Sequence, residues 1–264
     1  MSETAFELPA PQPMYRRVFS VWRRHQRVYF KFLLANILPP FLEPLMVILA
    51  LGVGLASYMG LVGGVSYAVF LAPGMMAASP MWSSSFETTY GTFIRMEYEK
   101  IYEAILGSPV SFVEMLLGEL LWVASKAAMF SLGVLLVVGS FGLVGSWWSL
   151  LVPLLGFLGG MIFALLGILV TSQVREINNF NFYLTGVITP MYFFSGAIFP
   201  LEQLPIPLQH LCGVLPMTYL VGLMRACCIG RFTPGLLLDL AVCLAYCAAL
   251  WPLAASQLRK RIVV

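Results

Sequence analysis

Side chains that could carry out acid–base or metal chemistry are few and scattered in this sequence. Its 264 residues include two histidines, His25 and His210, and five cysteines with no CxxC pair. An active site or a metal site needs several such groups brought together. The GxxxxGK[ST] loop that cradles nucleotide phosphates is also missing from the sequence. We therefore expect neither catalysis nor a bound cofactor or metal in this chain.

The charged residues are too sparse for a water-soluble protein. Only 10% of the residues are charged and 60% are hydrophobic, whereas a soluble domain has about a quarter charged residues. The net charge of +3 is too small to indicate a nucleic-acid partner. Carriers coupled to protons or sodium usually bury ionisable groups within the membrane. Here Glu43, Lys126 and Asp239 lie near the ends of apolar stretches, so the energy for transport would come from another subunit.

Long stretches without charge predict the elements that must position any functional side chain. Residues 44–86 and 127–174 hold 43 and 48 uncharged residues, and each stretch has room for two spans of roughly 20 residues and a turn. Residues 177–201 and 232–258 each predict one more span, the latter interrupted by Asp239. We expect an all-α polytopic membrane protein with six transmembrane helices.

The positions of the basic residues predict the orientation of these spans. With six spans, 13 of the 15 basic residues fall on one side and only Arg225 and Arg231 on the other. The basic side of a membrane protein is normally the cytoplasmic side. A seventh span within residues 203–224 would move the C-terminal basic cluster outside, so we favour six spans with both termini in the cytoplasm.

The first 33 residues predict a cytoplasmic tail and an amphipathic helix at the membrane interface, followed by a transmembrane domain over residues 34–264. Between Tyr15 and Lys31 the polar residues recur at helical spacing opposite an apolar face. The polar residues are Arg16, Ser20, Arg23, Arg24, Arg27 and Lys31, and the apolar ones are Tyr15, Val18, Phe19, Trp22 and Tyr29. Such a helix lies among the headgroups, where anionic lipid attracts its cations. It is either a plain anchor or also the border of a lateral access route for a lipid-like substrate.

Four further features are predicted besides the spans themselves. A short cytoplasmic helix before Gly107 and Pro109 could contact a partner or could be a solvated loop. The apolar, proline-rich segment 200–230 predicts two re-entrant helices, broken at residues 213–216, that cap the outer side, or else a segment on the surface. Glu43 and Lys126 have similar predicted depths, so an ion pair between them is one hypothesis. The cysteines are either apolar fillers or include a disulfide from Cys212 to Cys227 or Cys228.

Several longer strings resemble the type-2 ATP-binding-cassette exporter permeases, most closely the nodulation protein J group. The resemblance covers nearly the whole chain after residue 30. The strings are EPL at 43–45, GVGL at 52–55, LAPG at 71–74, FETTYG at 86–91, YEAILGSPV at 102–110, GELLW at 118–122, TPMYFFSGAIFP at 189–200 and LPMT at 215–218.

The resemblance implies a permease subunit in the bacterial inner membrane. Such a subunit would form a homodimer, bind two copies of a separate cytoplasmic ATPase that holds ATP and Mg, and export an amphiphile. The group points to a lipid-linked or lipochitin oligosaccharide. Drugs, polyols and other glycolipids remain alternatives within the family. An ion-coupled secondary transporter and a membrane glycosyl- or phosphotransferase remain alternatives outside it.

The resemblance also implies functional residues in two regions. The coupling helix to the ATPase would cover residues 97–106, and its contact residues would be Glu97, Tyr98, Glu99, Lys100, Tyr102 and Glu103. The first, second and fifth spans would line the path between two protomers, with the candidates Glu43, Trp82, Phe86, Met191, Tyr192 and Phe194. Aromatic and methionine side chains suit sugar rings and acyl chains. The same side chains could instead face lipid or pack between helices.

Overall fold

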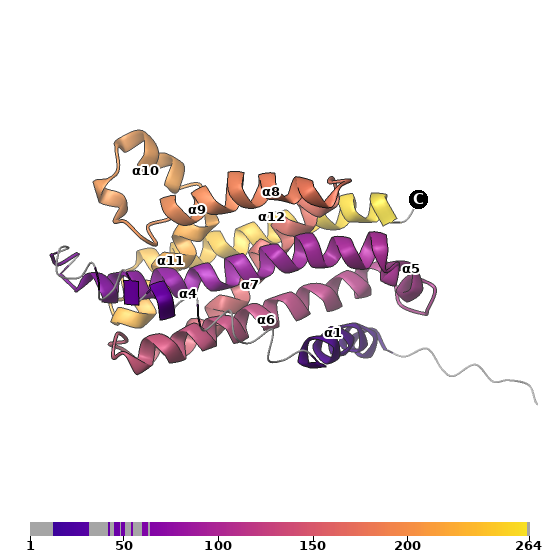
Figure 1. Ribbon diagram of the computed structural model, residues 1–264, viewed down its shortest axis with the longest axis horizontal. Coiled ribbons are helices and arrows are strands. Elements are labelled where there is room, and N and C mark those ends of the chain that lie inside the picture. Colours follow the sequence, from indigo (N-terminus) through magenta and orange to yellow (C-terminus); the bar gives the residue numbers. More distant parts are fainter. Residues whose placement is uncertain are drawn as a thin grey trace, which may run out of the picture.

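A computed structural model describes residues 13–31, 42, 45–47, 49–50, 54, 60–62 and 64–262. Within these ranges the regular secondary structure is helical, apart from an isolated β-bridge between Val62 and Val65, which confirms the predicted all-α class. Figure 1 shows long helices lying side by side, with α1, α5 and the end of α12 at one end of the bundle and α10 at the other. These four helices are α1 (Met14–Lys31), α5 (Ile101–Leu106), α10 (Ile206–Cys212) and α12 (Gly235–Ile262).

The helix α4 continues beyond its own end into two π-helical turns. α4 covers Tyr67–Phe86, and the turns η2 and η3 cover Glu87–Gly91 and Ile94–Tyr98. Thr92 between the turns keeps helical dihedrals, with φ −63° and ψ −43°. The chain therefore forms one long rod from α4 to the α5 end of the bundle. π-Turns within helices frequently occur at functional sites.

Among the residues that the structure describes, three helices are long and apolar enough to cross a membrane. They are α6 (Phe112–Ser140), η4 with α7 (Trp147–Thr171) and α12. α10 and α11 (Pro216–Ile229) pass the same test only as a pair, which is bent by 83° at the break between them. The break lies where the sequence predicts it, between residues 212 and 216.

The predicted fifth span, residues 177–201, consists of several short helices. η5 (Ile177–Asn179) leads into α8 (Phe180–Tyr183), η6 (Leu184–Ile188) and α9 (Thr189–Phe194), and η7 (Leu201–Gln203) follows after a turn. The dihedrals at Leu184 and Thr189 are helical, so α8, η6 and α9 form one irregular helix. Most of the predicted first span lies outside the described residues. The count of six spans therefore stays a prediction.

Pro80, inside α4, creates a contact between three helices. Proline has no N–H, so Pro80 leaves the carbonyl of Met76 without its helical donor. The Ser131 hydroxyl of α6 donates to that carbonyl at 3.3 Å. Gly156 of α7 lies against the same serine, and a Cβ at Gly156 would lie only 2.3 Å from Ser131 Oγ. The small residue thus lets α7 approach α6 beside the interruption in α4.

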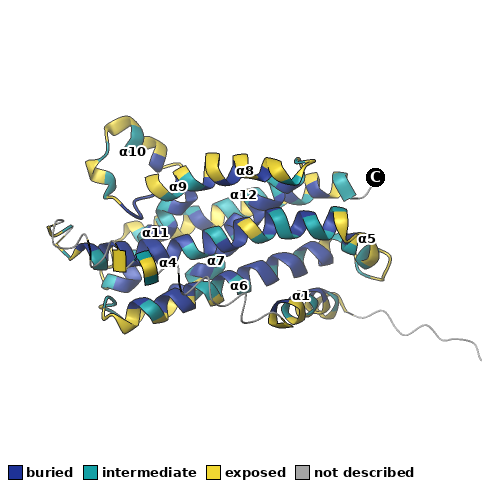
Figure 2. Cartoon of the chain, in the orientation of Figure 1, coloured by how far each residue is buried: buried dark blue, intermediate teal, exposed yellow. Residues whose placement is uncertain are grey.

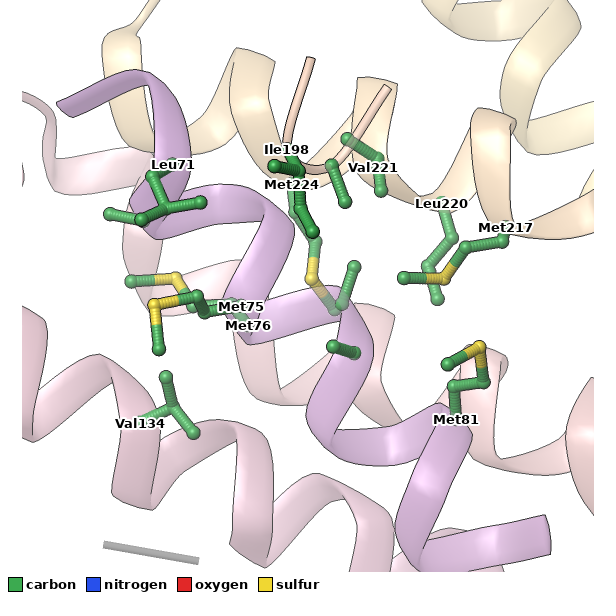
Figure 3. Packing of buried hydrophobic residues seen from close by; sticks show 14 of the residues in the cluster. Leu71, Met75, Met76, Met81, Val134, Ile198, Met217, Leu220, Val221 and Met224 are labelled. Atoms are coloured by element: carbon green, nitrogen blue, oxygen red, sulfur yellow. The ribbon is translucent and has the colours of Figure 1, made fainter. Parts of the chain in front are cut away.

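The largest buried cluster lies between α4, α6, α7 and α11, and methionines fill much of it. Figure 3 shows Met75, Met76 and Met81 of α4 in the same cluster as Met217 and Met224 of α11. Unbranched methionine fills irregular gaps between helices well. Figure 2 shows buried residues concentrated along α4, α6 and α7, whereas α8 and α10 carry many exposed residues. α4 is therefore packed against α6, α7 and α11.

Candidate functional site

Four charged side chains form a buried chain of ion pairs at the α5 end of the bundle. Lys126 Nζ lies 2.7 Å from Glu87 Oε2, and Arg95 Nη1 lies 2.8 Å from Glu87 Oε1. Arg95 Nη2 lies 2.9 Å from Glu119 Oε1. The side chains are between 1% and 15% exposed. We call these four residues the ion network. Its two cations and two carboxylates balance, as buried charges require.

α5 is attached to the ion network through Tyr102. The Tyr102 side chain is 1% exposed, and its hydroxyl donates to Glu119 Oε2. Thr92 Oγ1 donates to the other carboxylate oxygen at 2.5 Å. Burial, together with the negative charge of Glu119, raises the pKa of Tyr102 well above its usual range, so the hydroxyl remains a proton donor. A displacement of α5 relative to α6 must therefore change this hydrogen bond.

α1 covers one side of the ion network. His25 is 5% exposed, and its Nε2 has no hydrogen-bond partner among the described residues. Burial and the nearby Arg95 lower the pKa of His25 to about 4, so the ring is neutral at pH 7. The Tyr29 ring lies next to the ion network as well, with its centroid 5.3 Å from Lys126 Nζ. These side chains and Glu87 line a cavity of about 270 Å³.

Two arginines fasten α1 and α12 to the segments around α5. Arg17 Nη2 lies 2.9 Å from Glu114, and Arg17 Nη1 donates to the carbonyl of Pro109 at 2.9 Å. Arg261 Nη2 lies 2.7 Å from Glu97 Oε1, and Arg261 Nη1 donates to two carbonyls at the end of α7. The N-terminal helix and the last turn of α12 thus both contact the same end of the bundle.

The predicted coupling helix over residues 97–106 is wrong as a single helix. η3 ends at Tyr98, Lys100 has a left-handed backbone with φ +53°, and α5 begins only at Ile101. No glycine or proline marks this bend, so it could not be predicted from the sequence. The side chains of the predicted contact residues point in two directions as a result. Tyr98, Glu99, Lys100 and Glu103 are exposed, whereas Tyr102 is buried and Glu97 pairs with Arg261.

The predicted path residues are only partly brought together. Trp82 and Phe86 stack with ring centroids 5.9 Å apart, and Tyr90 continues the row 6.0 Å from Phe86. Met191 belongs to the largest buried cluster, and Trp82 and Tyr192 are partly buried at the edge of that cluster. Phe194 is 37% exposed and lines a separate apolar hollow of about 370 Å³. Glu43 lies outside the described residues.

The structure describes Lys126 and all five cysteines, for which the sequence raises an ion pair and a disulfide as hypotheses. Lys126 has Glu87 as its partner, and the proposed pair with Glu43 lies outside the described residues. All five cysteines are free, so the disulfide from Cys212 to Cys227 or Cys228 is absent. Four of the cysteines are buried and Cys247 is half-buried, as expected for apolar fillers.

Comparison with known proteins identifies the kind of membrane protein that this bundle is. The profile of the family described as "ABC-2 type transporter" matches residues 16–229. The chain belongs to this ABC-2 family. It is 39% identical to nodulation protein J of Rhizobium meliloti (strain 1021) over 92% of this chain and 93% of the relative. It is 38% identical to nodulation protein J of Rhizobium leguminosarum bv. trifolii over the same shares.

The chain also resembles a more distant permease of the inner membrane. The chain is 22% identical to the inner membrane transport permease YadH of Escherichia coli (strain K12), over 91% of this chain and 94% of the relative. ABC-2 permeases lack an ATPase domain and pair with separate ABC ATPase subunits. This ABC-2 permease is therefore a transport subunit, and the cofactor ATP belongs to its partner. The energy of ATP must reach the permease through a protein contact.

The partners in the ion network of this ABC-2 permease were not predicted from the sequence. Glu87 falls within the FETTYG string and Arg95 follows it, yet neither residue stood out by its spacing. The one pattern that indicates the ion network is the pair Glu119 and Lys126, which are two turns apart on one helix and share a helical face. The sequence could not show which residues on other segments this face would meet.

Proposed function

We propose that this ABC-2 permease is the membrane subunit of an ATP-driven exporter, and that the exposed bend before α5 receives the ATPase. The observation that carries the proposal is the hydrogen bond from Tyr102 to Glu119, which joins α5 to the buried ion network. Tyr98, Glu99, Lys100 and Glu103 are exposed around the bend. A partner can therefore contact these four residues while Tyr102 transmits the displacement inward.

In this proposal two permeases form a homodimer with two ATPase subunits in the bacterial inner membrane. Each permease has six spans and both termini in the cytoplasm, and α10 with α11 forms a re-entrant cap on the outer side. The charge distribution supports this orientation, since Lys100, Arg175 and Arg259 belong to the α5 end and Arg225 belongs to α11. The bend of 83° between α10 and α11 supports a cap.

Closure of the ATPase dimer would push the two α5 helices and shift the balance between two states of the permease. A partner can shift this balance only if it interacts differently with the two states. The Tyr102 to Glu119 contact and the Arg95 pairs with Glu87 and Glu119 are suited to this role, because their geometry depends on how η3 and α5 sit against α6. The α4 rod then carries the movement toward the other end.

The cargo in this proposal is an amphiphile, a lipid-linked or lipochitin oligosaccharide. The similarity to nodulation protein J and the aromatic row Trp82, Phe86 and Tyr90 support this class. Aromatic faces can bind both sugar rings and acyl chains without a fixed charge. Drugs, polyols and other glycolipids are the alternative cargoes.

Reconstituted permease and ATPase provide the test of the coupling role. Tyr98→Ala combined with Glu99→Ala should weaken binding of the ATPase, because both side chains are exposed at the bend. Tyr102→Phe should leave binding intact but reduce export per ATP hydrolysed, because it removes only the buried hydroxyl. As a control, Lys260→Gln changes an exposed residue at the same end of the bundle. Unchanged export per ATP in both test variants would refute the coupling role.

The cargo and the energy source need separate measurements. Mass spectrometry of lipids that co-purify with the native complex should find a glycan-bearing amphiphile. Vesicles that contain the permease without the ATPase should show no transport under a proton or sodium gradient. Transport in those vesicles would instead indicate a secondary transporter, and metal-dependent product formation by the permease alone would indicate a transferase.

A further inference from the structure

α1 has three faces, although its sequence pattern suggests two. At about 100° per residue, the residues predicted to form a single apolar face divide into a buried part and an exposed part. The buried part packs on α6 and contains Val18 and Tyr29 of the predicted apolar face, together with Val21 and His25. The exposed part contains Tyr15 at 68% and Phe19 at 53% exposure, with Trp22 half-buried at its edge.

A large apolar groove lies between the exposed aromatic face and α6. It has a volume of about 1030 Å³, and Leu121 and Ser125 of α6 form its opposite wall. Trp22 closes the floor, since its Nε1 donates to Ser125 Oγ at 3.2 Å and its ring stacks on Phe19 at 5.1 Å. A groove of this size and character suits a hydrocarbon chain.

The third face of α1 is a row of cations beside the aromatic residues. Arg16, Arg23 and Arg27 are seven and four residues apart, so helical geometry places them along one line. All three are exposed, and none belongs to an ion pair among the residues that the structure describes. Arg17, on another side of the helix, is by contrast paired with Glu114. The row therefore carries positive charge that no carboxylate of the described chain offsets.

We propose that the groove between α1 and α6 is a binding site for one anionic phospholipid of the surrounding leaflet. One acyl chain lies along Tyr15, Phe19 and Trp22 against Leu121, and the phosphate binds Arg23 and Arg27. Guanidinium groups bind phosphate oxygens with paired hydrogen bonds. An unoccupied groove would expose aromatic surface, and a neutral lipid would leave the cations without a partner. One anionic phospholipid covers the aromatic surface with its acyl chain and supplies a negative charge to the cations.

The bound lipid would hold α1 against α6 beside the ion network. Trp22 lies about one helical turn before His25, and Ser125 is next to Lys126 in the chain; His25 and Lys126 line the neighbouring cavity. A lipid over Trp22 thus stabilises the packing that keeps His25 buried. This role is distinct from transport of cargo, so lipid binding can be tested without assuming any exported substrate.

Native mass spectrometry of the purified full-length permease tests the site. The probes are phosphatidylglycerol and phosphatidylcholine, both with two oleoyl chains. We expect one phosphatidylglycerol per chain to bind more tightly than phosphatidylcholine. The double variant Arg23→Gln/Arg27→Gln should weaken phosphatidylglycerol binding by roughly 30-fold, about fivefold for each cation. The matched control Arg259→Gln/Lys260→Gln removes the same charge from exposed positions on α12 and should leave binding unchanged.

A second measurement locates the acyl chain. Phosphatidylglycerol with brominated chains should quench the fluorescence of Trp22, taken as the difference between the wild type and Trp22→Phe. Phe19→Ala, an exposed change that the fold does not need, should weaken binding by several-fold. Equal affinity for the two lipids, equal losses in the two double variants, or no quenching of Trp22 would each overturn the proposal.

Discussion

At the scale of single residues, Glu87 is the carboxylate of the ion network that contacts both of its cations. It contacts Lys126 at 2.7 Å and Arg95 at 2.8 Å, and both cations are at most 14% exposed. Arg95 has a second carboxylate partner in Glu119, whereas Lys126 has no other ion-pair partner among the described residues. A buried ion pair contributes little net stability, but a buried charge that loses its partner is strongly destabilising. The consequences of removing Glu87 and Lys126 should therefore not add.

We predict that Glu87→Gln lowers the free energy of unfolding by about 3–5 kcal/mol. Adding Lys126→Gln should recover part of this loss, since Arg95 and Glu119 then remain as a neutral pair. Denaturant titration of the purified permease in mixed micelles measures both effects. Glu103→Gln is the control, because its pair with Lys100 is exposed and should be worth less than about 1 kcal/mol. Strictly additive losses in the double variant would contradict the idea of a shared network.

His25 makes the stability of the fold depend on pH. Its pKa falls from 6.5 to about 4 on folding, because of burial and the nearby Arg95 and Arg24, against the opposite effect of Glu119 and Glu87. Well above pH 6.5 the ring is neutral in both the folded and the unfolded state, so it adds nothing to the pH dependence of the free energy of unfolding. Between pH 6.5 and pH 5 only the unfolded state takes up the proton, so the free energy of unfolding should fall by about 2 kcal/mol.

Denaturant titrations at pH 7 and pH 5 check this prediction. His25→Gln should lose this part of the pH dependence, while His210→Gln, which changes the exposed histidine, should keep it. The comparison between the two variants separates His25 from the carboxylates that also titrate. If His25→Gln loses as much stability as the wild type between pH 7 and pH 5, then His25 is not the responsible group.

At the scale of secondary-structure elements, the close approach of α7 to the α4 rod positions the ion network. A Cβ at Gly167 would lie 2.0 Å from Thr88 Oγ1 in η2. The Thr88 hydroxyl donates to the carbonyl of Ser84 at 2.7 Å, and Thr171 Oγ1 donates to the carbonyl of Thr88 at 2.7 Å. Glu87 is the neighbour of Thr88 in the chain, so the packing of α7 fixes the place of this carboxylate.

We predict that Gly167→Ala destabilises the permease by about 1–3 kcal/mol through overpacking. Thr88→Ala in the same chain should restore part of the stability, because it removes the oxygen that the new methyl group would meet. Thermal unfolding of the purified protein is the measurement. Gly139→Ala serves as the control, since nothing lies within 4 Å of a Cβ there. A loss in Gly139→Ala as large as in Gly167→Ala would show that the packing against Thr88 is not the cause.

The elements differ in how well the sequence predicts them, and the difference has physical causes. α6, α7 and α12 follow from long apolar stretches, and the break between α10 and α11 follows from Gly213 and Pro216. The bend at Lys100 has no such signal, because a left-handed lysine is favoured only by its surroundings. The ion network is equally hidden, since its pairs join residues up to 39 positions apart. Periodicity shows which residues share a face but not which face of another helix they meet.

At the scale of the whole molecule, the charges divide between the two ends of the bundle. Arg261 contacts Glu97 beside α5, so the last turn of α12 lies at the α5 end. Arg225 of α11 donates to the carbonyl of Gly196 near the other end. This arrangement agrees with the excess of basic residues that the sequence assigns to one side of the membrane. A membrane crossing by α10 and α11 together would put the C-terminal turn of α12 on the side opposite α5, and the contact between Arg261 and Glu97 argues against it.

Labelling from outside intact cells distinguishes these topologies, and we predict that the six-span arrangement holds. In Gln203→Cys the new thiol is at an exposed position between α9 and α10, and a membrane-impermeant maleimide should label it directly. Glu103→Cys in α5 and Arg259→Cys in α12, also exposed, should react only after permeabilisation. The wild type is the control, since four of its five cysteines are buried and the fifth is half-buried. Direct labelling of Arg259→Cys would mean that the chain crosses an odd number of times, because Arg259 would then lie opposite the cytoplasmic N-terminus that the basic face of α1 predicts.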